Sequence, residues 1–279
     1  MKWQGRRGSS NVEDRRGKGG KAVIGGGLGV GGIIIYLIIT LLGGNPGDLL
    51  DSITTTTSST QTSGNYQLSQ QEQELSQFVS VVLADTEDVW SEVFRQEGLT
   101  YENPTLVLYT DSVQSACGTS SSAVGPFYCP GDHKLYIDLS FYNELQTQFQ
   151  APGDFAMAYV IAHEVGHHVQ TLLGTTEKYA SRMQQDNTYQ VRFELQADYL
   201  AGVWAHYAQD KNLLEAGDID EALNAASAVG DDTLQEKARG YAVPESFTHG
   251  SSEQRKSWFN KGFESGTIEG GDTFNASSL

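Results

Sequence analysis

The stretch "VIAHEVGHHVQ", residues 160–170, places histidines and a glutamate in an otherwise apolar run. Such a run is expected to be buried, and a buried polar group without a partner is costly, an unpaired charge even more so. On a helix, residues four apart lie on one face, so His163 and His167 would point at a single place. Any fold of this chain must therefore contain a buried helix with a partner for two imidazoles.

The spacing His163-Glu164-x-x-His167 indicates what that partner is. Two imidazoles one helical turn apart suit two ligands of a tetrahedral zinc ion. Glu164 directly follows the first histidine, where its carboxylate can take a proton from a water molecule at the metal. The alternative is a pair of hydrogen-bonded core histidines. Placement of the motif in a helix predicted over residues 154–173 favours the metal.

A catalytic zinc ion needs a third protein ligand and an open fourth position. The segment "RFELQADYLAGVW", residues 192–204, offers Glu194 and Asp198, four apart on a predicted helix over residues 188–209. Glu194 would bind the metal. Asp198, one turn later, would accept a hydrogen bond from the outer ring nitrogen of a ligand histidine. The alternative is a solvated acidic face, which the apolar residues around both acids argue against.

Residues 22–42 carry no charge and are about as long as a helix that crosses the hydrocarbon core of a bilayer. The preceding residues 1–21 are basic, so the positive-inside rule predicts a cytoplasmic N-terminus and an extracytoplasmic domain. A cleaved signal peptide is the alternative, but the long basic lead favours a retained single-pass anchor in the cell membrane. Glycines four apart in this run leave helix pairing, and hence a homo-oligomer, as an open alternative.

The rest of the chain divides by composition. Residues 43–67 are rich in Thr, Ser and Gly and predict a linker, residues 68–265 a folded domain, and residues 266–279 a flexible tail. Strands are expected at 105–110 and 134–139, and the domain is therefore α+β and helix-rich. Its expected helices are 69–98, with a possible break near Asp85, 140–150, 154–173, 188–209, 218–229 and 252–263.

Charge and cysteine content narrow the class of protein. The formal net charge is −17, with a basic tip on an acidic body, which excludes an ordinary nucleic-acid binder because its Lys and Arg would lie on the folded domain. Cys117 and Cys129 enclose a loop-like stretch rich in Gly, Ser and Pro. They would form a disulfide in an oxidising compartment and stay as free thiols in the cytosol. The predicted extracytoplasmic location of the domain favours the disulfide.

The motif pair "HEVGH" and "ELQAD" resembles the gluzincin metallopeptidases, in which the third zinc ligand is a Glu with an Asp one turn later. The basic lead "RRGSSNVEDRRG", the apolar span and "SFTHGSSEQR" extend the likeness over nearly the whole chain. In these segments the chain is similar to the bacterial putative neutral zinc metallopeptidase family. The resemblance implies a zincin-like domain behind one transmembrane helix, one zinc ion, and hydrolysis of peptide or protein substrates, by an endopeptidase rather than an exopeptidase.

The segment "SFTHGSSEQR", residues 246–255, also resembles the His…Arg segment of membrane CaaX-processing-type zinc peptidases. By that likeness His249 would donate a hydrogen bond to the oxyanion, and Arg255 would hold a carboxylate or the substrate backbone. Those peptidases have prolines after the His, where this chain has Gly250 and Ser251. The alternative is a loop histidine and a surface arginine.

Two other functions stay open. One is a membrane-tethered binding or scaffold protein with a structural zinc site. Glu164 argues against it, because a structural site needs no base. The other is a zinc amidase acting on cell-wall material, which only the choice of substrate would separate from a peptidase.

Overall fold

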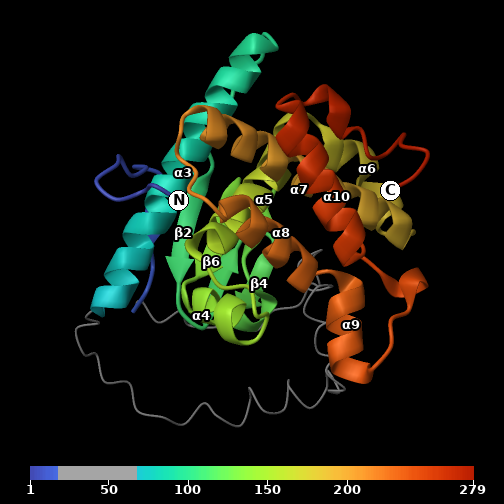
Figure 1. The fold of residues 1–279 in the computed structure, drawn as a ribbon, viewed down its shortest axis with the longest axis horizontal. Helices are drawn as coiled ribbons and strands as arrows, with labels where there is room; N and C mark the ends of the chain where they lie inside the picture. Colours follow the sequence, from blue (N-terminus) through green and yellow to red (C-terminus); the bar gives the residue numbers. More distant parts are fainter. Residues whose placement is uncertain (18–67) are drawn as a thin grey trace.

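The computed structural model of the protein describes residues 1–17 and 68–279. Figure 1 shows a small sheet in the middle of the molecule, with the long helix α3 (Gln70–Gln96) along one side and the helices of the C-terminal half along the other. The prediction of a helix-rich α+β fold is confirmed. The predicted span 22–42 and linker 43–67 lie outside the described residues. Among the described helices, none has the length and apolar character that a membrane span requires.

The sheet has four strands in the order β1-β2-β6-β5. Its centre is formed by β2 (Thr105–Tyr109) and β6 (Lys134–Asp138), which are parallel and almost fully buried, as their apolar and aromatic residues predict. The flanking strands β1 (Val12–Asp14) and β5 (Phe127–Cys129) are each three residues long, too short to leave a pattern in the sequence. Strand β5 is antiparallel to β6 and forms one edge. A separate hairpin consists of β3 (Ser112–Ser115) and β4 (Gly118–Ser121).

The helices that the sequence predicts are formed. Helix α3 begins at the predicted capping box of Ser69 and Glu72 and continues through Asp85 without a break. The other predicted helices are α4 (Ser140–Thr147), α5 (Asp154–Leu172), α7 (Asn187–Asp210), α8 (Asp218–Ala228) and α10 (Ser252–Ser265). Two helices are unexpected, α6 (Thr175–Met183) and α9 (Asp231–Arg239). Helix α6 buries no residue and α9 buries two polar ones, so neither carries an apolar period to detect.

Helices α7 and α10 cross closely. A Cβ atom at Gly202 would collide with the Phe259 carbonyl, and one at Gly262 with the Tyr199 carbonyl. The two glycines therefore let the helix backbones approach each other directly. This crossing brings the N-terminal part of α10 against the middle of α7, which carries the acidic residues of the predicted metal site.

The two ends of the described chain pack against the rest of the domain. Residues 1–17, part of the predicted basic segment 1–21, add β1 to the sheet and pack along α3. In the predicted tail, residues 266–279, the Phe274 ring stacks on Tyr179 with ring centroids 3.7 Å apart, and Thr273 is fully buried. Arg192 on α7 donates hydrogen bonds to the carbonyls of Thr273 and Ala276 and holds the tail in place. Neither end has the long apolar period from which such packing could be predicted.

Candidate metal centre

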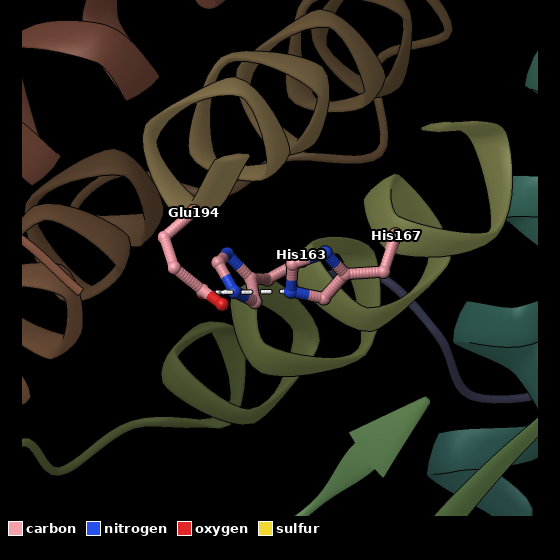
Figure 2. A group of neighbouring side chains, drawn as sticks. All are labelled: His163, His167 and Glu194. Carbon is pink, nitrogen blue, oxygen red and sulfur yellow. Dashed lines mark hydrogen bonds and ion pairs between the residues drawn. The ribbon is translucent and has the colours of Figure 1, made fainter. Parts of the chain in front are cut away.

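Helices α5 and α7 bring the predicted ligands together, as Figure 2 shows. His163 and His167 point from one face of α5 toward Glu194 on α7. The Nε2 atoms of His163 and His167 lie 3.1 and 3.4 Å from Oε2 of Glu194. The close approach of the helices depends on Gly166, because a Cβ atom there would lie 2.9 Å from the Ala197 carbonyl oxygen.

The hydrogen bonds behind His163 fix which of its nitrogens faces Glu194. Nδ1 of His163 lies 2.8 Å from an oxygen of Asp198 and donates its proton to that carboxylate. In a neutral ring the lone pair is then on Nε2, on the side of Glu194. Asp198 is fully buried, and Tyr159 donates a further hydrogen bond of 2.5 Å to the same oxygen. Asp198 therefore lies where the sequence predicts it, against the outer ring nitrogen of a candidate ligand, and its orienting role stays a prediction.

His167 is oriented by Gln170, a residue that the sequence analysis missed. Nδ1 of His167 lies 2.8 Å from Oε1 of Gln170, whose amide nitrogen donates to the Phe193 carbonyl. That second bond fixes the amide orientation, so Oε1 is the acceptor and Nδ1 the donor. The lone pair of His167 Nε2 therefore also faces Glu194. The available signal was Gln170 itself, a buried amide three residues after a ligand histidine.

Three acceptor atoms thus meet at one point: two imidazole lone pairs and a carboxylate oxygen, all within 4.8 Å of one another. Such an arrangement needs positive charge, which either a metal ion between the atoms or a proton on an imidazole can supply. Ligands of tetrahedral zinc at about 2.0–2.1 Å lie about 3.3 Å apart, close to the two separations between the imidazoles and Glu194. The residues therefore fit a zinc ion in both chemistry and spacing.

The pKa directions follow from this convergence of charge. Burial acts to raise the pKa of Glu194, but the two imidazoles hold it well below its usual range. Burial acts to lower the pKa of His163, but Asp198 and Glu194 raise it to about 9. The pKa of Glu164 is raised, because burial outweighs the attraction of the neighbouring imidazoles. Glu164 is thus the more basic of the two glutamates, which suits a group that accepts a proton.

His249 lies on the loop between η2 (Pro244–Ser246) and α10, next to the metal centre. One oxygen of Asp231 accepts hydrogen bonds from the backbone amides of residues 248, 249 and 250, and the other lies 3.3 Å from Nδ1 of His249. Burial acts to lower the pKa of His249, but Asp231 and Glu194 raise it. The side chain remains 22% exposed. Sequence reasoning missed Asp231, which lies eighteen residues before its partner and in no recognisable motif.

Arg255 on α10 is buried against α7. It is 4% exposed, and its Nε and Nη2 atoms donate to the two oxygens of Asp198 at 2.8 and 2.9 Å. Nη2 also donates to the Tyr159 hydroxyl at 3.1 Å. The carboxylate that Arg255 holds in the structure is that of Asp198, which in turn contacts the candidate ligand His163.

Comparison with known protein families matches residues 1–274 to the family described as "Putative neutral zinc metallopeptidase". The chain belongs to this family. The match covers the N-terminal segment, both helices of the metal centre and the His249 loop. It confirms the resemblance seen in the motifs and supports a zinc peptidase in general.

Two relatives of this chain match it over different shares of its length. A protein of Escherichia coli (strain K12), "Uncharacterized protein YpfJ", is 48% identical over 99% of this chain and all of its own length. A protein of Mycobacterium tuberculosis (strain H37Rv), "Uncharacterized protein Rv2575", is 45% identical over 64% of this chain and 65% of its own. No solved structure matches the chain.

Strand β5 is tied to the metal helix and to the neighbouring hairpin. The Tyr128 hydroxyl donates to Nδ1 of His168 at 3.0 Å, and Nε2 of His168 donates to the Glu102 carbonyl at 2.6 Å. Burial lowers the pKa of His168 to about 4, so the ring is neutral, and both of its nitrogens are used in structural hydrogen bonds. The predicted disulfide between Cys117 and Cys129 is formed and joins β5 to the β3–β4 turn. The edge strand is therefore fixed to α5 at the residue that follows the candidate ligand His167.

Proposed function

We propose that this protein is a zinc-dependent endopeptidase in which His163, His167 and Glu194 hold one zinc ion. The observation that carries the proposal is that three acceptor atoms meet at one point. Each histidine is held in its orientation by a hydrogen bond from Nδ1, to Asp198 or Gln170. Zinc bound there would act as a Lewis acid toward the scissile carbonyl and would acidify a water molecule. A helix with the two histidines, a second with the glutamate and an antiparallel edge strand together support a zincin-like domain.

Glu164 is the proposed general base. It follows a ligand histidine on α5, it is buried, and its pKa is raised by that burial. The carboxylate would accept a proton from the attacking water and deliver it to the leaving amine. A metal site with a purely structural role has no use for such a group.

His249 is the proposed donor to the oxyanion. Asp231 holds Nδ1 and raises the pKa of the ring, which favours a protonated imidazole with Nε2–H free to donate. The loop packs against α7 through Gly250, where a Cβ atom would lie 3.3 Å from Leu195 and Val191. His249 is therefore placed beside the helix that carries Glu194, where negative charge would develop on the reacting carbonyl.

Strand β5 is the proposed docking edge for the substrate. Within the described sheet, β5 pairs with β6 on one side only. An extended peptide can add to such an edge by main-chain hydrogen bonds, a mode that suits cleavage inside a chain rather than at its end. The bond between Tyr128 and His168 fixes this edge next to the metal helix. Membrane attachment through residues 22–42 stays a prediction.

The test is the variant Glu164→Gln, which keeps the size of the side chain and removes the base. We expect zinc content and folding to stay unchanged while kcat for an unstructured protein substrate such as casein falls about 10²–10⁴-fold, the usual contribution of a general base. Glu177→Gln, on the exposed part of α6, is the matched control and should keep full activity.

Two outcomes would contradict the proposal. If Glu164→Gln binds zinc but neither it nor the parent chain cleaves any protein, the site is that of a scaffold with structural zinc. If the parent chain releases products from peptidoglycan fragments but not from casein, and Glu164→Gln abolishes that release, the enzyme is an amidase.

A further inference from the structure

The N-terminal segment, residues 1–17, is built into the domain that carries the metal centre. Its strand β1 pairs in parallel with β2, with Val12 opposite Leu106 and Asp14 opposite Leu108. The Leu106 amide donates to the Asn11 carbonyl and the Arg15 amide to the Leu108 carbonyl, both at 2.8 Å. The segment therefore supplies one edge of the central sheet.

Residues 3–11 lie along α3 and meet its buried acidic residues. Both oxygens of Asp85 accept hydrogen bonds from the Arg6 guanidinium. Ser9 and Asn11 both donate to Glu87, at 2.6 and 2.7 Å. Asp85 and Glu87 are only 4% and 6% exposed, so the middle of α3 depends on this segment for the partners of its carboxylates.

The arginines of the segment are used by this packing. Arg6 and Arg7 pair with acidic residues of α3, whereas Arg15 and Arg16, which directly follow β1, pair with acidic residues of that strand. The positive-inside rule treats the same four side chains as free charges that keep the N-terminus in the cytoplasm. In the structure these four charges are engaged in ion pairs. They therefore no longer argue for an N-terminus on the other side of the membrane from the domain. Their partners are Asp85, Asp88, Glu13 and Asp14, respectively.

We infer that residues 1–17 are a permanent element of the metallopeptidase domain, and that the N-terminus lies on the same side of any membrane as the metal centre. A chain that crossed a bilayer once between Gly17 and Leu68 would place β1 and β2 on opposite sides. The sheet pairing, the buried ion pair and the contacts to Glu87 could not then form. A single-pass topology with a cytoplasmic N-terminus and an external domain is therefore incompatible with this fold.

Gly8 provides a direct test, because it faces α3 at Ser80. A Cβ atom on Gly8 would lie 3.4 Å from the Cβ of Ser80, close to the separation of about 3.8 Å in a disulfide. The double variant Gly8→Cys/Ser80→Cys is made in the full-length chain and oxidised with copper phenanthroline in isolated bacterial membranes. Tryptic digestion and mass spectrometry then show whether the two positions are linked within one molecule.

We expect an intramolecular link in most molecules of the double variant and none in either single variant. The inference is overturned if the two positions stay unlinked although both thiols react with maleimide after denaturation. It is also overturned if the link joins two copies of the chain. Neither result depends on peptidase activity, so this test can fail while the proposed function stands.

A second test reads the side of the membrane itself. Ser10→Cys and Ser181→Cys place single exposed thiols on the N-terminal segment and on α6. Intact cells that express each full-length variant are treated with a membrane-impermeant maleimide before or after lysis. We expect the two thiols to behave alike, both labelled before lysis or both only after it. Labelling of one position before lysis and of the other only after it would overturn the inference.

Discussion

The metal centre and the contact between the N-terminal segment and α3 both bury carboxylates, but they satisfy them in opposite ways. At α3, each buried acid meets donors: Arg6 covers Asp85, and Ser9 and Asn11 cover Glu87. At the metal centre, Glu194 meets two imidazole lone pairs, and the Nδ1–H groups of both rings point away from it, toward the acceptors Asp198 and Gln170. A carboxylate facing donors is complete without a ligand, whereas one facing acceptors needs a cation. The comparison separates a structural ion pair from a binding site.

The largest effect, on zinc content, is expected at Glu194, the carboxylate that faces two acceptor nitrogens. Glu194→Ala removes one of the three proposed zinc ligands, so zinc content should fall from about one ion per chain to near zero, and proteolysis with it. Elemental analysis after gel filtration measures the change. The matched control Glu177→Ala, an exposed acid on α6, should keep its zinc. Retention of a full zinc equivalent by Glu194→Ala would remove the basis of the comparison.

A substitution of Arg255 tests the residues that support the proposed ligands, since Arg255 contacts Asp198 and Asp198 contacts His163. Arg255→Met leaves the fully buried Asp198 without its cation, which should lower the free energy of unfolding by about 3–5 kcal/mol. Chemical denaturation of the purified full chain measures the loss. The double variant Arg255→Met/Asp198→Asn should recover part of it, because no buried charge is then left unpaired. A single variant as stable as the parent chain would contradict the pairing of Arg255 with Asp198 and favour the alternative of a surface arginine.

Gln170 should affect the metal more than the fold. Gln170→Leu removes the acceptor for Nδ1 of His167, and zinc affinity should weaken about 10–100-fold, as for other residues that orient a ligand. Competition with a chelator of known affinity measures the change. Gln170→Glu keeps an acceptor and should stay close to the parent chain. Equal affinities for the leucine variant and the parent would mean that His167 needs no such support.

The smallest effect is expected at the contact between Arg6 and Asp85, where hydrogen-bond donors already satisfy the buried carboxylate. Arg6→Ala should lower the free energy of unfolding by about 1–2 kcal/mol, since Arg6 is partly open to solvent, and should leave zinc affinity unchanged. Arg95→Ala, on the exposed end of the same helix, is the control and should have no measurable effect on stability. A loss of zinc in Arg6→Ala at temperatures where the protein is folded would contradict the division between the two regions.

The sequence predicts the parts of the fold that carry long periodic patterns. Helices α3, α5 and α7 and strands β2 and β6 are of this kind, and the ligand helices follow from their motifs. The sequence did not predict β1 and β5, because three residues carry no period, or α6, because it buries nothing. These elements exist through contacts with distant parts of the chain.

The candidate site divides in the same way. Residues related by one helical turn, such as His163 and His167 or Glu194 and Asp198, can be found by spacing. Gln170 and Asp231 act through contacts that depend on the packing of whole helices and loops, and Arg255 reaches Asp198 only because α10 crosses α7 closely. The N-terminal arginines show the converse case, since a local charge count predicts one topology, whereas the pairing of β1 and the ion pairs to α3 lead us to infer another.

The central claim is that three side chains from α5 and α7 share one metal ion. X-ray absorption at the zinc edge of the purified full chain tests it most directly. We predict one zinc ion per chain, with two imidazole nitrogens and a carboxylate oxygen at about 2.0–2.1 Å. A chain that binds no zinc when purified in its presence, or a spectrum that Glu194→Ala leaves unchanged, would contradict the account.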